Sequence, residues 1–346
     1  METSIKEYHH IIRVGDTYAS YKDQMTEVLD KLEALTEGKK VFFLRFFISD
    51  AANQQDVLVN ALKERGITEV SIIQQPPLDG SKISVWLWAV EGEFNPEYQH
   101  QVTYGLTSDQ GNSLDQMSDI FECYEAELDA EGKSVADDCV RTWIFVRDVD
   151  TNYAGVVVGR RNYFDAVGLT PETHYIASTG IQGAHSDYHK VVVMDAYAVK
   201  GLKPSQILYL QAKSHLNPTY EYGVTFERGT SITYGDRKHI FISGTASIDN
   251  KGQILHEGDV RNQAIRMMEN ISVLLAEAGA GIDDIKSAIL YMRDPSDYNL
   301  ISQLFKERWP NLDPVFVKAP VCRPGWLIEM ECVAILFRLN TQFANL

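Results

Sequence analysis

The alternation of apolar and polar positions divides the chain into segments that repeat one order of elements. The last segment shows this order most fully. The pattern there predicts strands at 240–243 and 253–255, a helix at 260–278, a strand at 287–292, a helix at 296–308, and strands near 315–321 and 327–335. The long helix carries Ile265, Met268, Leu274 and Leu275 on one face. The order β-β-α-β-α-β-β predicts an α+β unit whose helices cover one face of a mixed sheet.

The two earlier segments repeat this order with less of it visible. The middle segment predicts a helix capped by Ser113, a strand at 141–146, a helix at 153–167 that ends at Gly168, and strands at 173–178 and 190–199. The first segment shows mainly the second half of a unit, from 41 to 90. Residues 201–222, which contain Pro204 and Pro218, are predicted to be a connector.

A direct comparison of the segments supports an internal repeat. Residues 137–148 align without a gap on residues 283–294, and residues 41–50 are a fainter third copy. The last strands of the units align through their alanines, Ala89, Ala198 and Ala334. This alignment gives one equivalent position to Ser84, Val193 and Glu329. We therefore predict units at 1–95 (a degenerate half unit), 96–222 and 223–346, packed around a pseudo-threefold axis as an intramolecular pseudotrimer.

Composition narrows the function classes. The chain has 346 residues, and its 45% hydrophobic and 23% charged residues are ordinary for a globular protein. Its net charge of −16 argues against nucleic-acid binding, which needs a basic surface. A small anionic substrate remains compatible with this charge if arginines gather locally.

The same composition gives expectations for compartment and cofactors. The N-terminus has no signal-peptide pattern, no apolar run is long enough to span a membrane, and the four cysteines lack CxxC spacing, so we expect a cytoplasmic protein with reduced thiols. His185 and His189 lack an evident third ligand, so no metal site is predicted. Without a Gly-x-Gly-x-x-Gly, P-loop or Gly-x-Ser-x-Gly motif, we expect no nucleotide cofactor and no serine nucleophile.

Several residues of the last unit resemble the YjgF-like family, also called reactive-intermediate imine deaminases. These are residues 242–245 (ISGT), Gln263, Asn270 and residues 328–331 (IEME). The resemblance implies a YjgF-like (chorismate mutase-like) fold and active sites in clefts between units. Family deaminases carry Pro-x-Arg on the penultimate strand to hold a substrate carboxylate, whereas this chain has Phe316 in that place. A phenyl ring cannot replace that guanidinium, which weakens the deaminase interpretation.

A second resemblance covers most of the chain. Tyr153, residues 159–160, residues 173–181, residues 222–229 and residues 321–323 are similar to blocks of the chorismatases. Chorismatases cleave the enolpyruvyl ether of chorismate and release pyruvate together with a dihydroxycyclohexadiene acid or a hydroxybenzoate. The resemblance implies this activity without a metal or organic cofactor, in a monomer that is itself a pseudotrimer or in a higher homo-oligomer.

Glu329 is the candidate catalytic acid. Cleavage of a vinyl ether requires protonation of a carbon, which a carboxylic acid can perform when burial raises its pKa towards neutrality. The family position and the contrast with Ser84 and Val193 favour this role. The alternative is a charge on a solvent-facing strand, shared with Glu331 two residues on.

The remaining candidates follow from the resemblance, and each has a structural alternative. Cys322 aligns with an active-site cysteine but suits a small buried apolar residue equally well. Arg160 and Arg228 are candidates for binding the two carboxylates of chorismate. The alternative is that each forms a surface ion pair, which would contribute little to stability. Arg147 is a third candidate, although its repeat partner Arg293 suggests a structural role at a strand end.

Three further positions complete the predicted substrate site: Tyr222, Gly244 and Ala246. Tyr222 would add a phenolic hydrogen bond or pack in the core. Gly244 would allow backbone to approach substrate or form a tight strand end. Ala246 would line the pocket and influence the product.

The sequence thus predicts a chorismatase-like enzyme with a small anionic substrate. An imine or enamine deaminase of the YjgF-like family, or a non-catalytic small-molecule-binding protein, are the alternatives.

Overall fold

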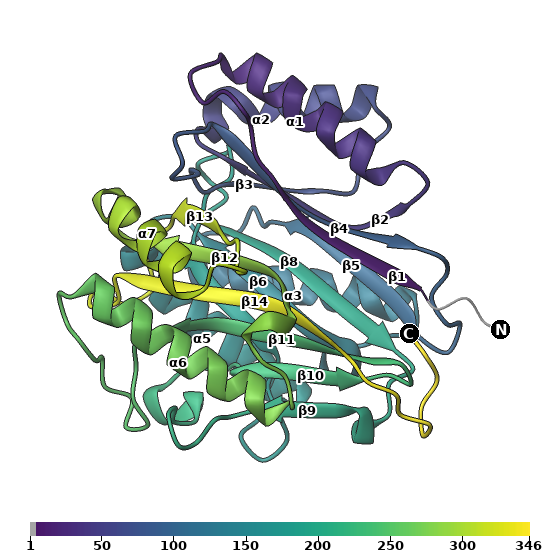
Figure 1. Cartoon of the computed structure of the whole chain (residues 1–346). Helices are drawn as coiled ribbons and strands as arrows, with labels where there is room; N and C mark the ends of the chain where they lie inside the picture. Colours follow the sequence, from purple (N-terminus) through teal and green to yellow (C-terminus); the bar gives the residue numbers. More distant parts are fainter. Residues whose placement is uncertain (1–4) are drawn as a thin grey trace.

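The computed structural model describes residues 5–346, apart from the side chain of Tyr222. It contains three mixed sheets, each with helices on one face, that succeed one another along the chain (Figure 1). The described N-terminal residues and the C-terminus lie on the same side of the molecule. Within residues 5–346, no helix is both long enough and apolar enough to cross a bilayer.

The first unit is more complete than the sequence indicated. Its elements are β1 (Lys6–Ile12), α1 (Tyr21–Thr36), β2 (Lys40–Ile48), α2 (Ala51–Glu64), β3 (Ser71–Gln74) and β4 (Ile83–Glu91). The sheet order is β1-β4-β2-β3, with β2 and β3 parallel and the other pairs antiparallel. The predicted half unit therefore omitted β1 and α1, which the structure contains. Strand β1, with the sequence KEYHHII, is mostly half-buried and polar, so it gives no clear strand alternation.

The second unit follows the predicted order, with one strand rather than a hairpin at its start. Its elements are β5 (Gln99–Leu106), α3 (Ser113–Ala130), α4 (Val135–Asp138), β6 (Cys139–Val146), α5 (Val149–Val167), β7 (Ala177–Gln182) and β8 (Val192–Lys200). The sheet order is β5-β8-β6-β7. Asn112 caps α3 with its side chain, one residue before the predicted cap Ser113, and Gly168 ends α5 in the left-handed conformation, as predicted.

The third unit has the full β-β-α-β-α-β-β order. Its main elements are β10 (Gly229–Thr233), β11 (Arg237–Ala246), α6 (Val260–Glu277), β12 (Ile285–Met292), α7 (Tyr298–Arg308), β13 (Val315–Lys318) and β14 (Ile328–Phe337). Short 3-10 turns, η3 (Ile282–Asp284) and η4 (Pro295–Asp297), precede β12 and α7. The prediction that residues 253–255 form a hairpin strand with 240–243 is wrong. Strand β11 pairs with β10 instead, and residues 253–255 contribute only an isolated bridge between Ile248 and Ile254.

The connector also has structure of its own. It forms η1 (Pro204–Gln206), β9 (Ile207–Leu210) and η2 (Thr219–Tyr222). Strand β9 joins the edge of the third sheet, whose order is β13-β12-β14-β11-β10-β9.

The three sheets meet at a buried centre that contains charges as well as aromatic rings. Arg45 of the first unit forms an ion pair with Asp195 of the second at 2.7 Å, and Arg141 of the second pairs with Glu331 of the third at 2.8 Å. Trp143 donates from its indole nitrogen to Glu331 at 2.8 Å. One apolar core that includes residues of all three units continues around these pairs. The units therefore pack as an intramolecular pseudotrimer, as the repeat predicted.

The strand registers confirm the alignment of the last strands. Ser84 lies opposite Phe47, Val193 opposite Phe145, and Glu329 opposite Tyr291. Asp195 and Glu331 are likewise equivalent, two positions further on. Glu331 is thus buried in an ion pair near the pseudo-threefold axis, and its role there is structural rather than that of a solvated surface charge.

Candidate active site

A pocket lies between the second and third units. About 520 Å³ of space lies between its lining atoms, its mouth included. The lining residues are Tyr153, Arg160, Ser178, Thr179, Gly180, Val224, Phe226, Arg228, Gly244, Ala246, Ile248, Cys322, Arg323, Trp326 and Glu329. The second unit supplies one wall from α5 and β7. The third unit and the end of the connector supply the other walls.

Most of the predicted site residues lie together in this pocket. They are Glu329, Cys322, Arg160, Arg228, Gly244 and Ala246. Arg147 does not lie there, because its guanidinium donates to the carbonyl of His185 and lies over the ring of Tyr188, 4.4 Å from its centroid. Arg147 thus has a structural contact at the end of β6, as its repeat partner suggested. Tyr222 lies in η2, and its side chain is outside the described part of the structure.

Glu329 points from β14 into the pocket and is 5% exposed. Burial, together with the nearby charge of Glu331, raises the pKa of its carboxyl to about 8, while Arg228 and Arg141 act in the opposite direction. The carboxyl packs against the backbone of Gly244, where an added Cβ would lie 2.9 Å from the carboxyl carbon. A side chain at Gly244 would therefore displace the carboxyl of Glu329.

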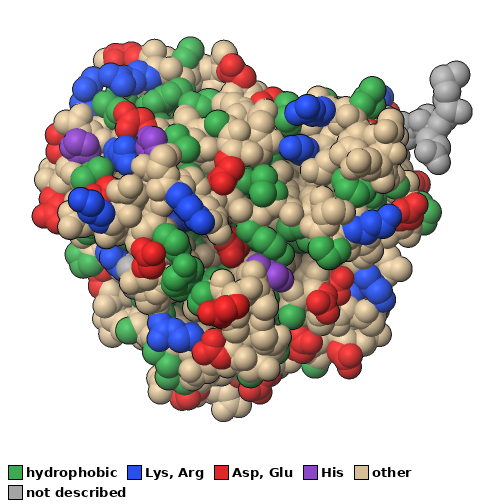
Figure 2. Space-filling view, turned by 90° about the horizontal axis from the view of Figure 1, so that it is seen from below, with side chains coloured by type: hydrophobic (Ala, Val, Ile, Leu, Met, Phe, Trp, Pro, Cys, Tyr) green, Lys and Arg blue, Asp and Glu red, His purple; other side chains and the backbone are tan. Residues whose placement is uncertain are grey.

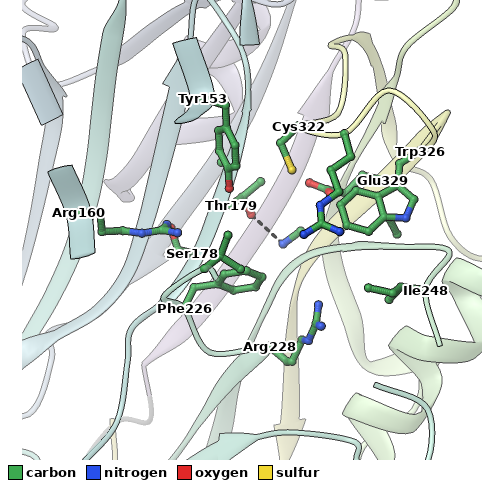
Figure 3. Close-up of a pocket in the computed structure, with 15 residues that line it drawn as sticks. Tyr153, Arg160, Ser178, Thr179, Phe226, Arg228, Ile248, Cys322, Trp326 and Glu329 are labelled. Atoms are coloured by element: carbon green, nitrogen blue, oxygen red, sulfur yellow. Dashed lines mark hydrogen bonds between the residues drawn. The ribbon is translucent and has the colours of Figure 1, made fainter. Parts of the chain in front are cut away.

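Two buried arginines stand on different sides of the space in front of Glu329 (Figure 3). Arg160 of α5 donates from Nε to Thr225 Oγ1 at 3.2 Å and reaches Ser178 Oγ at 3.5 Å. Arg228 donates to the carbonyl of Asn217 at 3.1 Å. On the face shown in Figure 2, basic and acidic side chains are interspersed. The chain as a whole is acidic, with a net charge of −16, so the arginines of this pocket are a local concentration of positive charge.

Cys322 and Tyr153 both line the pocket, and their side chains form a hydrogen bond. Burial raises the pKa of the Cys322 thiol to about 12, and Glu329 adds to this, while a hydrogen bond with Tyr153 opposes it. The thiol is therefore protonated at neutral pH and can donate or accept a weak hydrogen bond, but it is not a thiolate nucleophile.

Sequence reasoning did not select several pocket residues that the structure brings in. They are Tyr153, Ser178, Thr179, Phe226, Arg323 and Trp326. Tyr153, Ser178, Thr179, Phe226 and Arg323 lay within the blocks that resemble chorismatases, so a signal existed for them. Nothing in the local pattern marked Trp326, whose indole nitrogen donates to the carbonyl of Ser247 and whose ring lies 5.1 Å from the guanidinium of Arg323.

The two other junctions between units carry no equivalent acid in their described residues. The cleft between the first and second units contains Val193 where the pocket has Glu329, and Ile72 where it has Gly180. At the junction of the third and first units, the position of Glu329 is taken by Ser84, whose hydroxyl donates to the carbonyl of Ile12 at 3.0 Å. Among the three junctions, the acid thus occurs where the arginines also gather.

Phe316 lies in a cleft that faces the first unit and not in the pocket with Glu329. The strand position equivalent to Phe316 on the pocket side is Gly180 of β7. The arginine with which family deaminases hold a substrate carboxylate is thus absent at Gly180 and at Phe316. Both positions therefore argue against an ordinary deaminase site.

Comparisons with known proteins agree with this architecture. The family model described as Endoribonuclease L-PSP matches residues 231–336. A RutC family protein of Pyrococcus abyssi is 33% identical over 97 residues, which are 28% of this chain and 76% of that protein. The 3-aminoacrylate deaminase RutC of Acinetobacter baylyi is 30% identical over 97 residues, 28% of this chain and 77% of the relative. A crystal structure of a chorismatase superposes with a TM-score of 0.68 at 16% identity, covering 96% of this chain and 100% of that one.

Proposed function

We propose that this chain, which belongs to the RutC (endoribonuclease L-PSP) family and shares the fold of a chorismatase, is an enzyme that cleaves the enolpyruvyl ether of chorismate. The observation that carries the proposal is a buried carboxylic acid, Glu329, in a pocket flanked by buried arginines. The acid would donate a proton and the arginines would hold the anionic substrate.

The protonation state of Glu329 suits this chemistry. A general acid must carry its proton at the working pH and still be acidic enough to give it up, so the best pKa lies near that pH. The pKa of about 8 for Glu329 meets this condition at neutral pH, whereas an ordinary exposed glutamate would be ionised.

The charge pattern of the pocket suits a dianion. Chorismate carries two carboxylates, and Arg160 and Arg228 approach the pocket from separate elements and different sides. Guanidinium groups bind carboxylates through paired hydrogen bonds, which fix orientation as well as charge. The arginines lie inside a cavity instead of forming a basic surface stripe, and the net charge of −16 also disfavours RNA as the substrate.

The proposed reaction is balanced without any change of oxidation state. Glu329 gives its proton to the methylene carbon, and the adjacent carbon becomes an oxocarbenium ion. A water molecule then adds to that carbon, the ether C–O bond breaks, the ring oxygen takes a proton, and pyruvate and a dihydroxycyclohexadiene acid leave. Alternatively, the neighbouring hydroxyl of the substrate adds to that carbon and loses its proton, which gives a cyclic ketal. The ring C–O bond of that hydroxyl and the ketal bond to the ether oxygen then break, the ether oxygen takes a proton, and the ring loses a proton and becomes aromatic. Pyruvate, which keeps the hydroxyl oxygen, leaves with a hydroxybenzoate without net consumption of water. In both cases a released proton returns to Glu329.

Incubation of the purified protein with chorismate tests the proposal. Pyruvate is followed with lactate dehydrogenase and NADH, and the ring product is identified by mass. We expect pyruvate from the wild type and none from Glu329→Gln, which keeps the volume but cannot donate an acidic proton. Glu257→Gln, on an exposed loop, is the matched control and should retain full activity. Absence of pyruvate from folded wild type, or full activity in Glu329→Gln, would refute the proposal.

The relationship to a 3-aminoacrylate deaminase favours one alternative, the hydrolysis of an imine or enamine acid with Glu329 orienting water. Ammonia release from a 2-aminoacrylate-type intermediate, in a sample that yields no pyruvate from chorismate, would support it. A non-catalytic binder is the second alternative, and binding of chorismate without turnover would support that one.

A further inference from the structure

The hydroxyl of Thr179 has an unusual hydrogen-bonding situation. Thr179 lies on β7, lines the pocket and is 1% exposed. Its Oγ1 accepts a hydrogen bond from Arg141 Nη2 at 2.5 Å and a second from the backbone nitrogen of Gly244 at 2.9 Å. A threonine hydroxyl has two acceptor positions and one proton. Because both acceptor positions are taken, the hydroxyl can act further only as a donor.

Thr179 lies next to Glu329 at the edge of the pocket. Within residues 5–346, the Thr179 hydroxyl donates to no protein acceptor, although it is buried. Its methyl carbon and the carboxyl carbon of Glu329 lie 3.0 and 2.9 Å from the point that a Cβ on Gly244 would occupy, so the two side chains pack side by side across this glycine. In Figure 3, Thr179 and Glu329 border the same space, together with Tyr153 and Cys322. Thr179 therefore borders the pocket beside the acid, where its hydroxyl has a proton left to donate to a ligand.

Arg141 holds this arrangement from outside the pocket. Its guanidinium is 2% exposed and pairs with Glu331 near the pseudo-threefold axis. One Nη atom donates to Thr179, and the other donates to Ser243 Oγ at 3.3 Å, so the planar fork contacts strands of both units that form the pocket. The fork thereby fixes β7 against β11 at the point where Thr179 and Gly244 meet.

We propose that Arg141 is a positioning residue that makes Thr179 an obligate hydrogen-bond donor to the enolpyruvyl carboxylate of the substrate. The inference rests on the proposed function. The methylene carbon that receives the proton and the carboxylate are attached to the same carbon, so a methylene in contact with Glu329 places the carboxylate next to it. A fixed donor beside Glu329 would hold that carboxylate and aim the methylene at the acid.

Three variants test the proposal through the rate of pyruvate release. Thr179→Val keeps the shape and removes the hydroxyl, and we expect kcat/KM to fall by roughly 10²-fold, as for removal of one oriented donor in other enzymes. Thr179→Ser restores the hydroxyl and should recover most of the activity. Arg141→Met combined with Glu331→Gln removes the buried pair together, because removal of one partner alone leaves an uncompensated charge that endangers folding.

The coupling between these variants separates positioning from general damage. If Arg141 acts through Thr179, the double variant should lose activity to a similar extent, and adding Thr179→Val to it should cost little more. Independent losses that multiply would overturn the proposal, as would full activity in Thr179→Val. Calorimetric titration of chorismate into Glu329→Gln, with and without Thr179→Val, should show weaker binding when the hydroxyl is missing. Equal binding would count against the proposal.

A neutron crystal structure of the deuterated wild type gives a readout that does not depend on turnover. We expect the Thr179 deuteron to point into the pocket while Arg141 and Gly244 donate to its oxygen. A deuteron directed at a protein acceptor would overturn the positioning role even if chorismate is cleaved. If no pyruvate forms in any variant, the proposed function fails, and the neutron result still decides whether Thr179 is a donor.

Discussion

Gly180 and Phe316 occupy the same position of the penultimate strand in the second and third units, opposite Ile144 and Leu290 respectively. Gly180 borders the pocket with Glu329, whereas Phe316 faces a cleft against the first unit. The ring of Tyr153 fills the space beside Gly180, because a Cβ added there would lie 2.8 Å from a ring carbon and 3.1 Å from the phenolic oxygen. In this pocket, the phenol ring of Tyr153, on α5, thus lies where a side chain at position 180 of β7 would otherwise lie.

This relationship predicts the effect of Gly180→Ala. The added methyl must push Tyr153 away from Cys322 or towards the substrate space, so we expect a clear loss of kcat/KM, roughly tenfold or more, for a shift on the order of 1 Å at the reacting centre. Steady-state pyruvate release, with circular dichroism to check folding, measures the effect. Gly180 lies in β7 with a strand backbone conformation that alanine can also adopt, so the variant should still fold.

Phe316→Leu is the matched control for this substitution. It changes the equivalent strand position in the other cleft and keeps an apolar side chain there. Turnover of chorismate should be unaffected by it. Loss of activity in Phe316→Leu together with full activity in Gly180→Ala would show that the wrong cleft has been identified as the active site.

The position of Glu329 could be predicted from the sequence because strand registers follow from local patterns. The last strands are nearly continuous buried runs with one aligned alanine each, and a buried strand tolerates no slip without turning every side chain to the other face. The equivalence of Ser84, Val193 and Glu329 therefore held in the structure. The repeated order of elements held for the same reason, since it depends on periodicity within each unit.

The roles of Thr179 and Arg141 could not be predicted in this way. Arg141 meets Glu331, 190 positions further along the chain, and this contact depends on how the units pack. The pattern around Arg141 is that of any buried strand, and a charge within it gives no sign of its partner. Strand β1 was missed because its sequence, KEYHHII, is mostly polar and half-buried and has no alternating apolar pattern.

The pH dependence of turnover should follow the titration of Glu329. Burial raises the pKa of this carboxyl to about 8, so the proton needed for catalysis is present below that pH and is lost above it. We expect kcat/KM for chorismate to be level near neutrality and to fall tenfold per pH unit well above pH 8. A descending limb centred near the ordinary glutamate pKa, below pH 5, would contradict the assignment of Glu329 as the acid.

Substitution of Arg228 by methionine should move this limb. The positive charge of Arg228 lowers the pKa of Glu329, in opposition to burial. Its removal should therefore raise that pKa and shift the limb above pH 8, while KM rises because a carboxylate contact is lost. Arg228→Lys keeps a charge but not the planar fork, so it should leave the limb nearly in place and still raise KM. A limb that moves to lower pH in Arg228→Met would contradict the electrostatic argument.

The junction between the first and third units predicts an effect on stability rather than on turnover. Glu7 of β1 accepts hydrogen bonds from Arg237 and His239 of β11 at 2.7 and 2.9 Å, and its side chain is 1% exposed. Burial alone would raise the pKa of Glu7, but His239, His9 and Arg237 together outweigh it and lower the pKa to about 2. Glu7→Gln removes one counter-charge of the buried Arg237, which keeps Asp236 as an ion-pair partner, so we expect the unfolding free energy to fall by at most roughly 3–5 kcal/mol at neutral pH.

The pH dependence of this loss follows from the same shift. A carboxyl whose pKa is lower in the folded state stabilises the fold above its unfolded value of 4.5, and the stabilisation disappears as the pH falls towards 2. The difference between wild type and Glu7→Gln in urea unfolding should thus be constant above pH 5 and shrink in acid. Glu91→Gln, which removes a half-exposed partner of Lys6 on the same sheet, should cost far less stability, because exposed ion pairs contribute little. An equal effect of the two substitutions would show that the buried ion pair does not hold the first unit to the third.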